Sequence, residues 1–479
     1  MSESNACYVP IEKLNAIFGN RMKTENDFLE KYSHDETAGL KGELPSVVLF
    51  PVNASEISSV MKLANIHGFS VTPRGAGTGL SGGAIPSKDG VVLSLEKMNN
   101  VVEFDRENMM ITVEPGVITD EIQKIADKNN LMYAGDPCSS DSSTIGGNIA
   151  ENAGGNKVLK YGPTGYHVYG LEVVLPTGEI VTYGGKRLKD VTGLDMIHLL
   201  VGSEGILGIV TKIILRLIPK PKYTVALLAP FKTTEEAIEV VPKILTHSGI
   251  MPSSLEFMDK SSIRSSCKFL NVEFPYSEAG AHLIIEIEGN DKESIADIYE
   301  QLGDKCIEEG ALEVFVADNR TTRERLWKAR KSIAEALSAF SPVHCMEDVS
   351  VPMANIAELI REAEKISKKY DLDMIAFGHA GDGNVHITFL KGEREMEHWN
   401  NNLEKALTDL YKLTSNLGGC ITGEHGVGLK RKKYLSMTLD STQIDMIRKI
   451  KRVFDPNNIL NSGKMVDVTD NIAERRALS

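Results

Sequence analysis

The chain has 479 residues and a formal net charge of −13, with 42% hydrophobic and 25% charged residues. This length exceeds one ordinary hydrophobic core and predicts two or three domains, and the composition is that of a folded globular protein. The negative charge disfavours general binding to nucleic acid or to an anionic membrane, because the field of the protein repels polyanions.

The sequence carries no visible signal for export or membrane insertion. The first residues have neither a basic nor an apolar segment, so no secretory signal peptide is predicted. The most apolar stretch, Ile197 to Ile218, is interrupted by charged and polar residues such as Glu204, Lys212 and Arg216, which argues against a membrane span. We therefore expect a soluble, cytoplasmic protein.

Strands and short helices alternate in the first half of the chain. Residues 1–44 are expected to form an N-terminal helical segment. Within residues 45–220 the strand SVVLFPV, the helix SEISSVMKLANIHG and the strand FSVTPRG follow one another, which indicates a strand–helix–strand start. A hairpin around Thr177-Gly178 follows, and this pattern predicts a first domain of mixed strands and helices.

Two prolines near residue 220 mark a domain boundary. From 221 to 420 strands and helices alternate again, with a long helix from Thr321 to Phe340 and a hairpin near residues 371–390. This rhythm predicts a second, α+β domain. The last segment, residues 421–479, is predicted to be mainly helical.

Three glycine-rich loops are the first candidate binding elements. Residues 71–86, VTPRGAGTGLSGGAIP, place five glycines directly after a strand, where backbone N–H groups can surround phosphate oxygens. The match to GxGxxG is weak evidence for a Rossmann unit, because Ala84-Ile85-Pro86 follows and no helix can begin there. A merely flexible surface loop is the alternative. Residues 136–165 and 201–211 add two further irregular, glycine-rich stretches.

The strings PRGAGTGLSGG, TIGGNIAENAGGNKVLKYG and GSEGILGIVT resemble the FAD-binding domain of the vanillyl-alcohol oxidase superfamily. Within it, the chain is most similar to the group of glycolate oxidase D-subunits, D-lactate dehydrogenases and D-2-hydroxyglutarate dehydrogenases. The resemblance implies an α+β fold with a two-subdomain FAD-binding domain, an α+β cap domain for the substrate, and a C-terminal helical segment that returns to the flavin domain.

The same resemblance assigns residues to the cofactor. Relatives with covalent flavin carry a histidine in the first loop, and none occurs from Pro73 to Pro86, so noncovalent FAD is expected. The residues assigned to FAD are Arg74, Gly75, Ala76, Gly77, Thr78, Gly79, Ser81, Gly82, Pro137, Ser140, Gly146, Gly147, Asn148, Asn152, Ala153, Gly155, Glu204 and Ile209.

Two further motifs contain metal-binding residue types. DMIAFGHAGDGNVHITFL is typical of two strands joined by Gly-Asp-Gly. With the turn centred between Asp382 and Gly383, His379 and His386 are direct cross-strand neighbours, with Cβ atoms roughly 4.5 to 5.5 Å apart, and can chelate one ion. 

In TGEHGVG, Glu424 offers a third ligand, while His425 is expected to point elsewhere, because neighbouring side chains in extended backbone diverge. A glycine-rich turn with two solvated polar residues is the alternative.

The motifs GHxGDGNxH and EHGVG also resemble this group, in which the two histidines and the glutamate hold a divalent ion and the next histidine is the proposed base. Imidazole and carboxylate ligands admit Zn²⁺, Fe²⁺, Mn²⁺ or Co²⁺. By its LWxxR string the group places substrate-carboxylate binding on Arg330, whose planar fork suits two carboxylate oxygens. The neighbouring Arg320, Arg323 and Arg325 are expected on a solvated face.

One departure from the group concerns the substrate. Relatives specific for a dicarboxylic acid carry a lysine shortly before DxSxP, whereas this chain has Met346-Glu347 there. This difference favours a monocarboxylate such as lactate or glycolate over 2-hydroxyglutarate.

We therefore hypothesise an FAD-dependent, metal-assisted oxidation of a D-2-hydroxy acid, with His425 as base and Arg330 as carboxylate anchor. The six scattered cysteines offer no iron–sulfur site, so electrons are expected to pass to a partner such as an electron-transfer flavoprotein or an iron–sulfur subunit. An oxygen-using alcohol oxidase and a noncatalytic flavin-binding electron carrier remain as alternatives.

Overall fold

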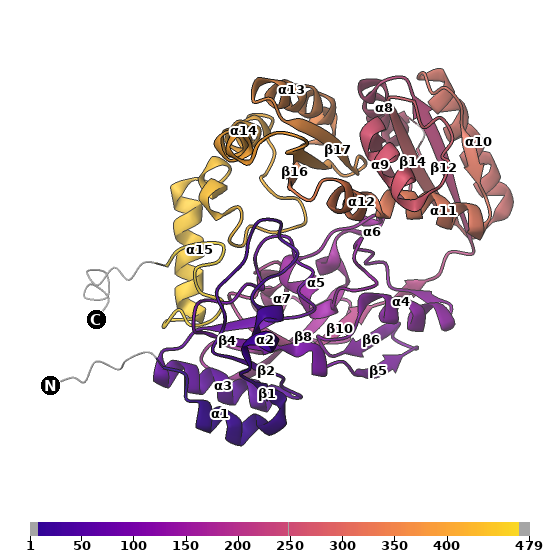
Figure 1. Cartoon of the computed structure of the whole chain (residues 1–479). Coiled ribbons are helices and arrows are strands. Elements are labelled where there is room, and N and C mark those ends of the chain that lie inside the picture. Colours follow the sequence, from indigo (N-terminus) through magenta and orange to yellow (C-terminus); the bar gives the residue numbers. More distant parts are fainter. Residues whose placement is uncertain (1–7, 248, 469–479) are drawn as a thin grey trace.

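The computed structural model describes residues 8–247 and 249–468, and within them the N-terminal domain contains three sheets (Figure 1). The first sheet has the order β1-β2-β4-β3, the second the order β5-β6-β10-β8-β9, and the third consists of β11 and β7. The strands of this domain are β1 (Met22–Lys23), β2 (Val47–Leu49), β3 (Val71–Arg74), β4 (Val91–Ser94), β5 (Val101–Asp105), β6 (Met110–Val113), β7 (Leu131–Met132), β8 (Val168–Val174), β9 (Ile180–Gly184), β10 (Ile209–Arg216) and β11 (Ile218–Pro219). The helices are α1 (Ile11–Phe18), α2 (Asn26–Leu29), α3 (Ala54–His67), α4 (Thr119–Lys128), α5 (Ile145–Glu151), α6 (Val158–Tyr161) and α7 (Met196–Leu200).

The strand–helix–strand start is present as β2, α3 and β3. These two strands are parallel, and β4 lies between them in the sheet. The apolar residues of β2 and β4 are fully buried, as expected for parallel strands covered on both faces. The N-terminal segment is less helical than expected, because α1 and α2 are short and Met22–Lys23 pairs with β2 as an edge strand.

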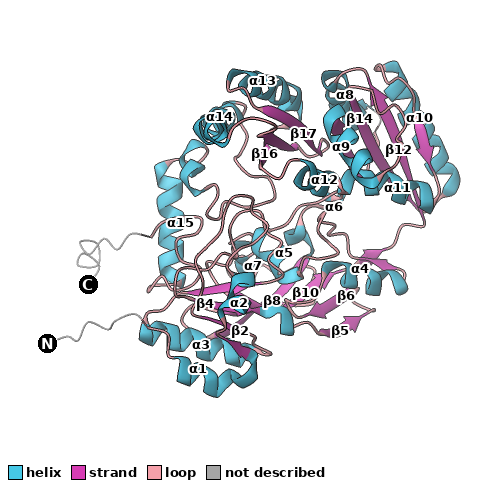
Figure 2. Ribbon diagram, in the orientation of Figure 1, coloured by secondary structure: helices cyan, strands magenta, loops and turns pink. Residues whose placement is uncertain are grey.

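The cap domain contains one antiparallel sheet of seven strands with the order β15-β12-β14-β13-β17-β18-β16 (Figure 2). Its strands are β12 (Tyr223–Phe231), β13 (Ser254–Asp259), β14 (Ala281–Gly289), β15 (Phe315–Ala317), β16 (His344–Ser350), β17 (Asp373–His379) and β18 (Asn384–Leu390). Its helices are α8 (Thr234–His247), α9 (Lys260–Leu270), α10 (Lys292–Glu308), α11 (Arg320–Lys331), α12 (Ile333–Phe340), α13 (Ile356–Lys369) and α14 (Met396–Asn416).

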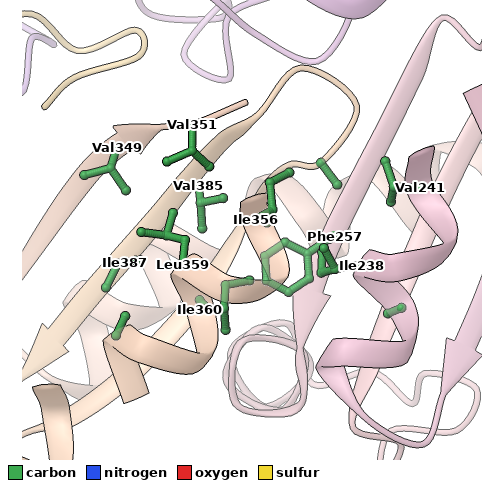
Figure 3. Packing of buried hydrophobic residues seen from close by; sticks show 14 of the residues in the cluster. Ile238, Val241, Phe257, Val349, Val351, Ile356, Leu359, Ile360, Val385 and Ile387 are labelled. Atoms are coloured by element: carbon green, nitrogen blue, oxygen red, sulfur yellow. The ribbon is translucent and has the colours of Figure 1, made fainter. Parts of the chain in front are cut away.

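Each face of the cap sheet packs against its own helices. On one face Phe257 of β13 packs among apolar residues of α8 and α13, such as Ile238 and Ile360 (Figure 3). On the other face Met258 and Phe377 pack against α9, α11 and α12. Because side chains alternate along a strand, Glu256 faces this second layer.

Two cap elements differ from the sequence predictions. The helix expected from Thr321 to Phe340 is divided into α11 and α12 at Ser332, which has φ −83° and ψ 3°. Serine is a weak helix former, and the regular helix stops there. Strand β13 has no counterpart among the predicted elements.

The hairpin of β17 and β18 forms, but in a different register from the predicted one. His379 pairs with Asn384 and His386 pairs with Phe377, so the turn is centred between Gly381 and Asp382. The expected direct pairing of the two histidines is therefore wrong. The length of the turn fixes the register of a hairpin, whereas the symmetric spacing of the histidines in the sequence does not. The two imidazoles are diagonal neighbours on one face, with ring centroids 5.6 Å apart.

The C-terminal segment contacts both domains. It includes α15 (Ser441–Phe454), and Leu460 forms a parallel bridge with Val71 of the N-terminal domain. The buried ammonium of Lys451 donates to the carbonyl oxygens of Ile206 and Leu460, at 2.8 and 2.7 Å. This segment therefore returns to the N-terminal domain. Across residues 8–247 and 249–468, no helix has the length and apolarity that crossing a bilayer requires.

Replacing Gly383 with alanine should destabilise the cap domain. Gly383 follows the turn centre with φ +91°, and a Cβ there would lie 2.1 Å from the carbonyl oxygen of Val351. Backbone strain and this collision together should lower the free energy of unfolding by about 3 kcal/mol. Gly310→Ala is the control, because Gly310 has φ +103° but an added Cβ meets no described atom within 4 Å. It should cost only about 1 kcal/mol in urea denaturation, and equal losses in the two variants would contradict the prediction.

Candidate active site

A cavity of about 700 Å³ lies where the N-terminal domain, the cap domain and the C-terminal segment meet. It falls in the range typical of ligand and cofactor sites, roughly 300 to 1,000 Å³. The glycine-rich loops of the N-terminal domain form much of its wall, Lys331 and Ser332 contribute from the cap, and Glu424 and His425 contribute from the C-terminal segment. The cavity thus joins elements that are distant in sequence.

Most of the residues assigned to FAD from the sequence line this cavity. They are Arg74, Gly75, Ala76, Gly77, Thr78, Gly79, Pro137, Gly146, Gly147, Asn148, Ala153, Glu204 and Ile209. The glycines and alanines among them leave backbone groups accessible to a bound molecule, while Arg74, Glu204 and Ile209 place larger side chains in the same wall.

The remaining assigned residues lie outside the wall, and these are Ser81, Gly82, Ser140, Asn152 and Gly155. They hold the loops in place. The carbonyl oxygen of Ser81 accepts hydrogen bonds from the backbone N–H groups of Leu429 and Lys430. Asn152 ends α5 with φ +53°, and its side-chain oxygen accepts from the N–H of Gly165.

Two glycines allow the walls to approach each other closely. A Cβ at Gly75 would lie 2.2 Å from Oγ1 of Thr144, and one at Gly154 would lie 2.4 Å from Oε2 of Glu424. The first two glycine-rich loops therefore touch each other, and the second loop touches Glu424. Any side chain at position 154 would displace this carboxylate.

Three predicted metal ligands converge beside the cavity. Oε1 of Glu424 lies 3.5 Å from Nε2 of His379 and 3.4 Å from Nε2 of His386. Two ligand atoms bound to one ion at about 2.1 Å in tetrahedral geometry lie about 3.4 Å apart. The buried Nε2 of His379 has no hydrogen-bond partner among the described residues, so the arrangement suits three ligands around a cation.

The pKa shifts within the cluster also favour a bound cation. Burial opposes protonation of His379, but Glu256 and Glu424 outweigh it and raise the pKa of His379 well above its usual value. Burial raises the pKa of Glu424, but His379 and His386 lower it to about 2. Burial lowers the pKa of His386 to about 3. The ionised carboxylate of Glu424 thus favours a positive charge beside it, and a bound divalent ion can supply that charge.

Asp348, which the sequence analysis did not include among the ligands, lies close to the same cluster. Asp348, His386, Glu424 and His425 each offer one ligand atom, and these atoms lie within 4.8 Å of one another. However, Oδ2 of Asp348 already accepts from the hydroxyl of Thr422 at 2.7 Å and from three consecutive backbone N–H groups. Asp348 therefore supports the loop.

The backbone of this loop explains a second difference from the sequence prediction. The N–H groups of Gly423, Glu424 and His425 all point to Oδ2 of Asp348, at 3.0, 3.0 and 2.8 Å. The backbone bends at these residues instead of extending, so the side chains of Glu424 and His425 do not diverge as expected.

His425 thus joins the cluster instead of pointing elsewhere. Its ring stacks on that of His386 with centroids 5.2 Å apart, and its Nε2 lies 3.8 Å from Oε1 of Glu424. Its side chain is 13% exposed and lines the cavity. Burial lowers the pKa of His425, which keeps the imidazole neutral and able to accept a proton.

Glu204 has a role that the sequence did not predict. Its Oε1 and Oε2 accept from the backbone N–H groups of Val427 and Gly428, at 2.7 and 2.6 Å. Asp348 thus binds the start of the loop 423–428, and Glu204 of the N-terminal domain binds its end.

Arg330 is buried beside the cluster and does not line the cavity. Its Nη2 lies 2.8 Å from Oε2 of Glu256, and its Nε donates to the same oxygen at 3.0 Å. The other oxygen of Glu256 lies 2.7 Å from Nδ1 of His379. Sequence reasoning missed Glu256, although a single carboxylate in the apolar strand SLEFMD was a usable signal.

Of the other arginines of α11, Arg320 and Arg325 are exposed, as expected, whereas Arg323 is half-buried. Arg320 pairs with Glu324 at 2.6 Å, and Arg323 donates to the carbonyl oxygen of Asp318. Glu347, the residue that departs from the dicarboxylate-specific pattern, is buried and paired with Lys430 and Arg431.

Comparison with known proteins identifies the family. A family of FAD-linked oxidases matches residues 220–465 through its C-terminal domain, and an FAD-binding domain family matches residues 45–184. A D-lactate dehydrogenase of Anaerostipes hadrus is 37% identical, covering 95% of this chain and 96% of the relative. Glycolate oxidase subunit GlcD of Bacillus subtilis is 40% identical and covers 91% of each. A D-2-hydroxyglutarate dehydrogenase of Stutzerimonas stutzeri is 29% identical over 93% of this chain.

Solved structures confirm the fold. p-Cresol methylhydroxylase superposes with a TM-score of 0.80 at 19% identity, covering 96% of this chain and 97% of that one. The 4-ethylphenol oxidase of Gulosibacter chungangensis superposes with a TM-score of 0.78 at 18% identity. Family, relatives and fold agree: the chain belongs to the FAD-linked oxidases and is an FAD-linked oxidoreductase with the fold of the vanillyl-alcohol oxidase superfamily.

Proposed function

We propose that this protein is a cytoplasmic, FAD-dependent and metal-assisted dehydrogenase of small D-2-hydroxy acids, with D-lactate or glycolate favoured. The observation that carries the proposal is the convergence of His379, His386 and Glu424 beside the cavity that the FAD loops line. The names of the relatives, D-lactate dehydrogenase and glycolate oxidase subunit, support the substrate class.

In this proposal the wall residues of the glycine-rich loops contact noncovalent FAD, and the five assigned residues outside the wall support those loops. His379, His386 and Glu424 hold a divalent ion such as Zn²⁺, Fe²⁺ or Mn²⁺. When bound, FAD supplies the hydride acceptor and the ion supplies a Lewis acid for the substrate hydroxyl.

The protein's own residues then have separate tasks. Nε2 of His425 takes the hydroxyl proton, since this neutral imidazole lines the cavity beside Glu424. Arg330 anchors the carboxylate through its guanidinium, which lies buried beside the cluster.

The choice of a monocarboxylate follows from the charge near the site. The buried carboxylate of Glu347 already pairs with Lys430 and Arg431, at 3.1 and 3.0 Å. These cations are therefore engaged, and a second substrate carboxylate would lack a free partner there. D-2-hydroxyglutarate, which carries this second carboxylate, is therefore the less favoured, alternative substrate. For reoxidation we propose a partner protein, either an electron-transfer flavoprotein or an iron–sulfur subunit.

A panel of 2-hydroxy acids mixed with the FAD-loaded protein without oxygen tests the function. D-lactate or glycolate should bleach the flavin absorption, whereas L-lactate should leave it unchanged and D-2-hydroxyglutarate should act weakly. A protein that no 2-hydroxy acid reduces would refute the proposal, and preferential reduction by D-2-hydroxyglutarate would select the alternative substrate.

Replacing His425 with alanine should slow anaerobic flavin reduction by roughly 10² to 10⁴-fold, because the proton acceptor is lost. The FAD content should stay at the wild-type level. His198→Ala is the matched control, since the exposed side chain of His198 pairs with Asp195 on the surface and lies outside the residues that line the cavity. Stopped-flow reduction rates for His425→Ala that match those of this control would disprove the assignment of the base.

Removing the metal should abolish reduction of the flavin by substrate while FAD remains bound. We expect dialysis against a strong chelator to stop bleaching and one divalent ion to restore it. His386→Ala should lower the metal content measured by elemental analysis. Full activity of metal-free protein would instead favour an alcohol oxidase that uses oxygen and needs no metal.

A further inference from the structure

Glu256 lies between two parts of the site that the proposed mechanism treats separately. One carboxylate oxygen, Oε1, is 2.7 Å from Nδ1 of the metal ligand His379. The other oxygen, Oε2, is 2.8 Å from Nη2 and 3.0 Å from Nε of Arg330. The side chains of Glu256, His379 and Arg330 are 1%, 3% and 2% exposed, so water does not screen these contacts.

The cap sheet dictates this position. Phe257 pairs with Gly378 and Met258 with Phe377 in the antiparallel ladder of β13 and β17. Continuing that register by one residue places Glu256 directly opposite His379, where cross-strand side chains approach most closely. On the same face α11 covers the sheet, and the guanidinium of Arg330 lies 5.1 Å from the centre of the Phe377 ring.

We propose that Glu256 is a positioning residue that joins the metal site to the substrate-carboxylate site. One oxygen holds Nδ1–H of His379, which leaves Nε2 free for the ion, and the other holds the guanidinium fork of Arg330. This inference rests on the proposed function, because it assumes that His379 binds a metal and that Arg330 binds a carboxylate.

Two observations favour this role over simple charge burial. A carboxylate that binds the second nitrogen of a histidine ligand fixes its tautomer and raises its basicity. His386 has no such direct contact, since its Nδ1 lies 3.8 Å from Oδ1 of Asp348. Glu256 also contacts His379 with one carboxylate oxygen and Arg330 with the other, so its position sets the distance between these two residues.

Zinc affinity tests the first half of the proposal. Glu256→Gln keeps the size of the side chain but removes the charge, and its amide has only one acceptor oxygen. The variant, with FAD bound, should bind Zn²⁺ roughly 10 to 100-fold more weakly than wild type in competition with a chromophoric chelator. Glu288→Gln is the control, because Glu288 is equally buried in the neighbouring strand β14 but pairs with Lys157 and Lys160.

Steady-state kinetics at saturating Zn²⁺ test the second half. Glu256→Asp keeps the charge, but its side chain is shorter by one methylene and cannot reach both His379 and Arg330. The KM for the best substrate of the acid panel should rise about tenfold or more while kcat stays within a few-fold, because Arg330 is misplaced and His425 is untouched.

The outcomes separate this inference from the proposed function. Zinc affinity of Glu256→Gln within about twofold of wild type, or an unchanged KM in Glu256→Asp, would overturn the role of Glu256. If the wild type binds zinc but no 2-hydroxy acid reduces the flavin, the proposed function fails. The zinc comparison still decides whether Glu256 positions His379 in that case.

Discussion

Two buried carboxylates hold one short loop, and the candidate active site depends on this constraint. Asp348, from the cap sheet, accepts the backbone N–H groups at the start of the loop 423–428. Glu204, from the N-terminal domain, accepts those at its end. Backbone donors that surround a carboxylate curve the chain around it. Glu424 and His425 are therefore presented together, at the junction of both domains.

This arrangement divides the site among three parts of the molecule. The N-terminal domain supplies the glycine-rich wall, the cap sheet supplies His379 and His386 from one hairpin, and the C-terminal segment supplies Glu424 and His425. No single part contains the full set of residues. Small residues such as Gly154 are required where the parts meet, since a Cβ there would collide with Glu424.

The fold alone does not explain this chemistry. The chain shares its architecture with p-cresol methylhydroxylase at a TM-score of 0.80, although the two sequences are only 19% identical. One architecture supports different reactions, and the reaction depends on the side chains placed around the cavity. Here those side chains form a cluster of buried carboxylates and imidazoles. Glu256 lies next to Nδ1 of His379, and Asp348 lies near Nδ1 of His386.

Much of the site was determined by local sequence. The glycine strings, the paired histidines and the Glu-His dipeptide identify residue types whose chemistry does not depend on distant partners, so the family, the FAD loops and the ligand candidates could be predicted. Tertiary structure decided the rest. The hairpin register, the bend that brings His425 beside Glu424, and the supporting roles of Asp348, Glu204 and Glu256 all arise from contacts between residues far apart in the chain. Periodicity reports which face of its own element a side chain occupies, whereas the partner across that face depends on how the strands and domains pack.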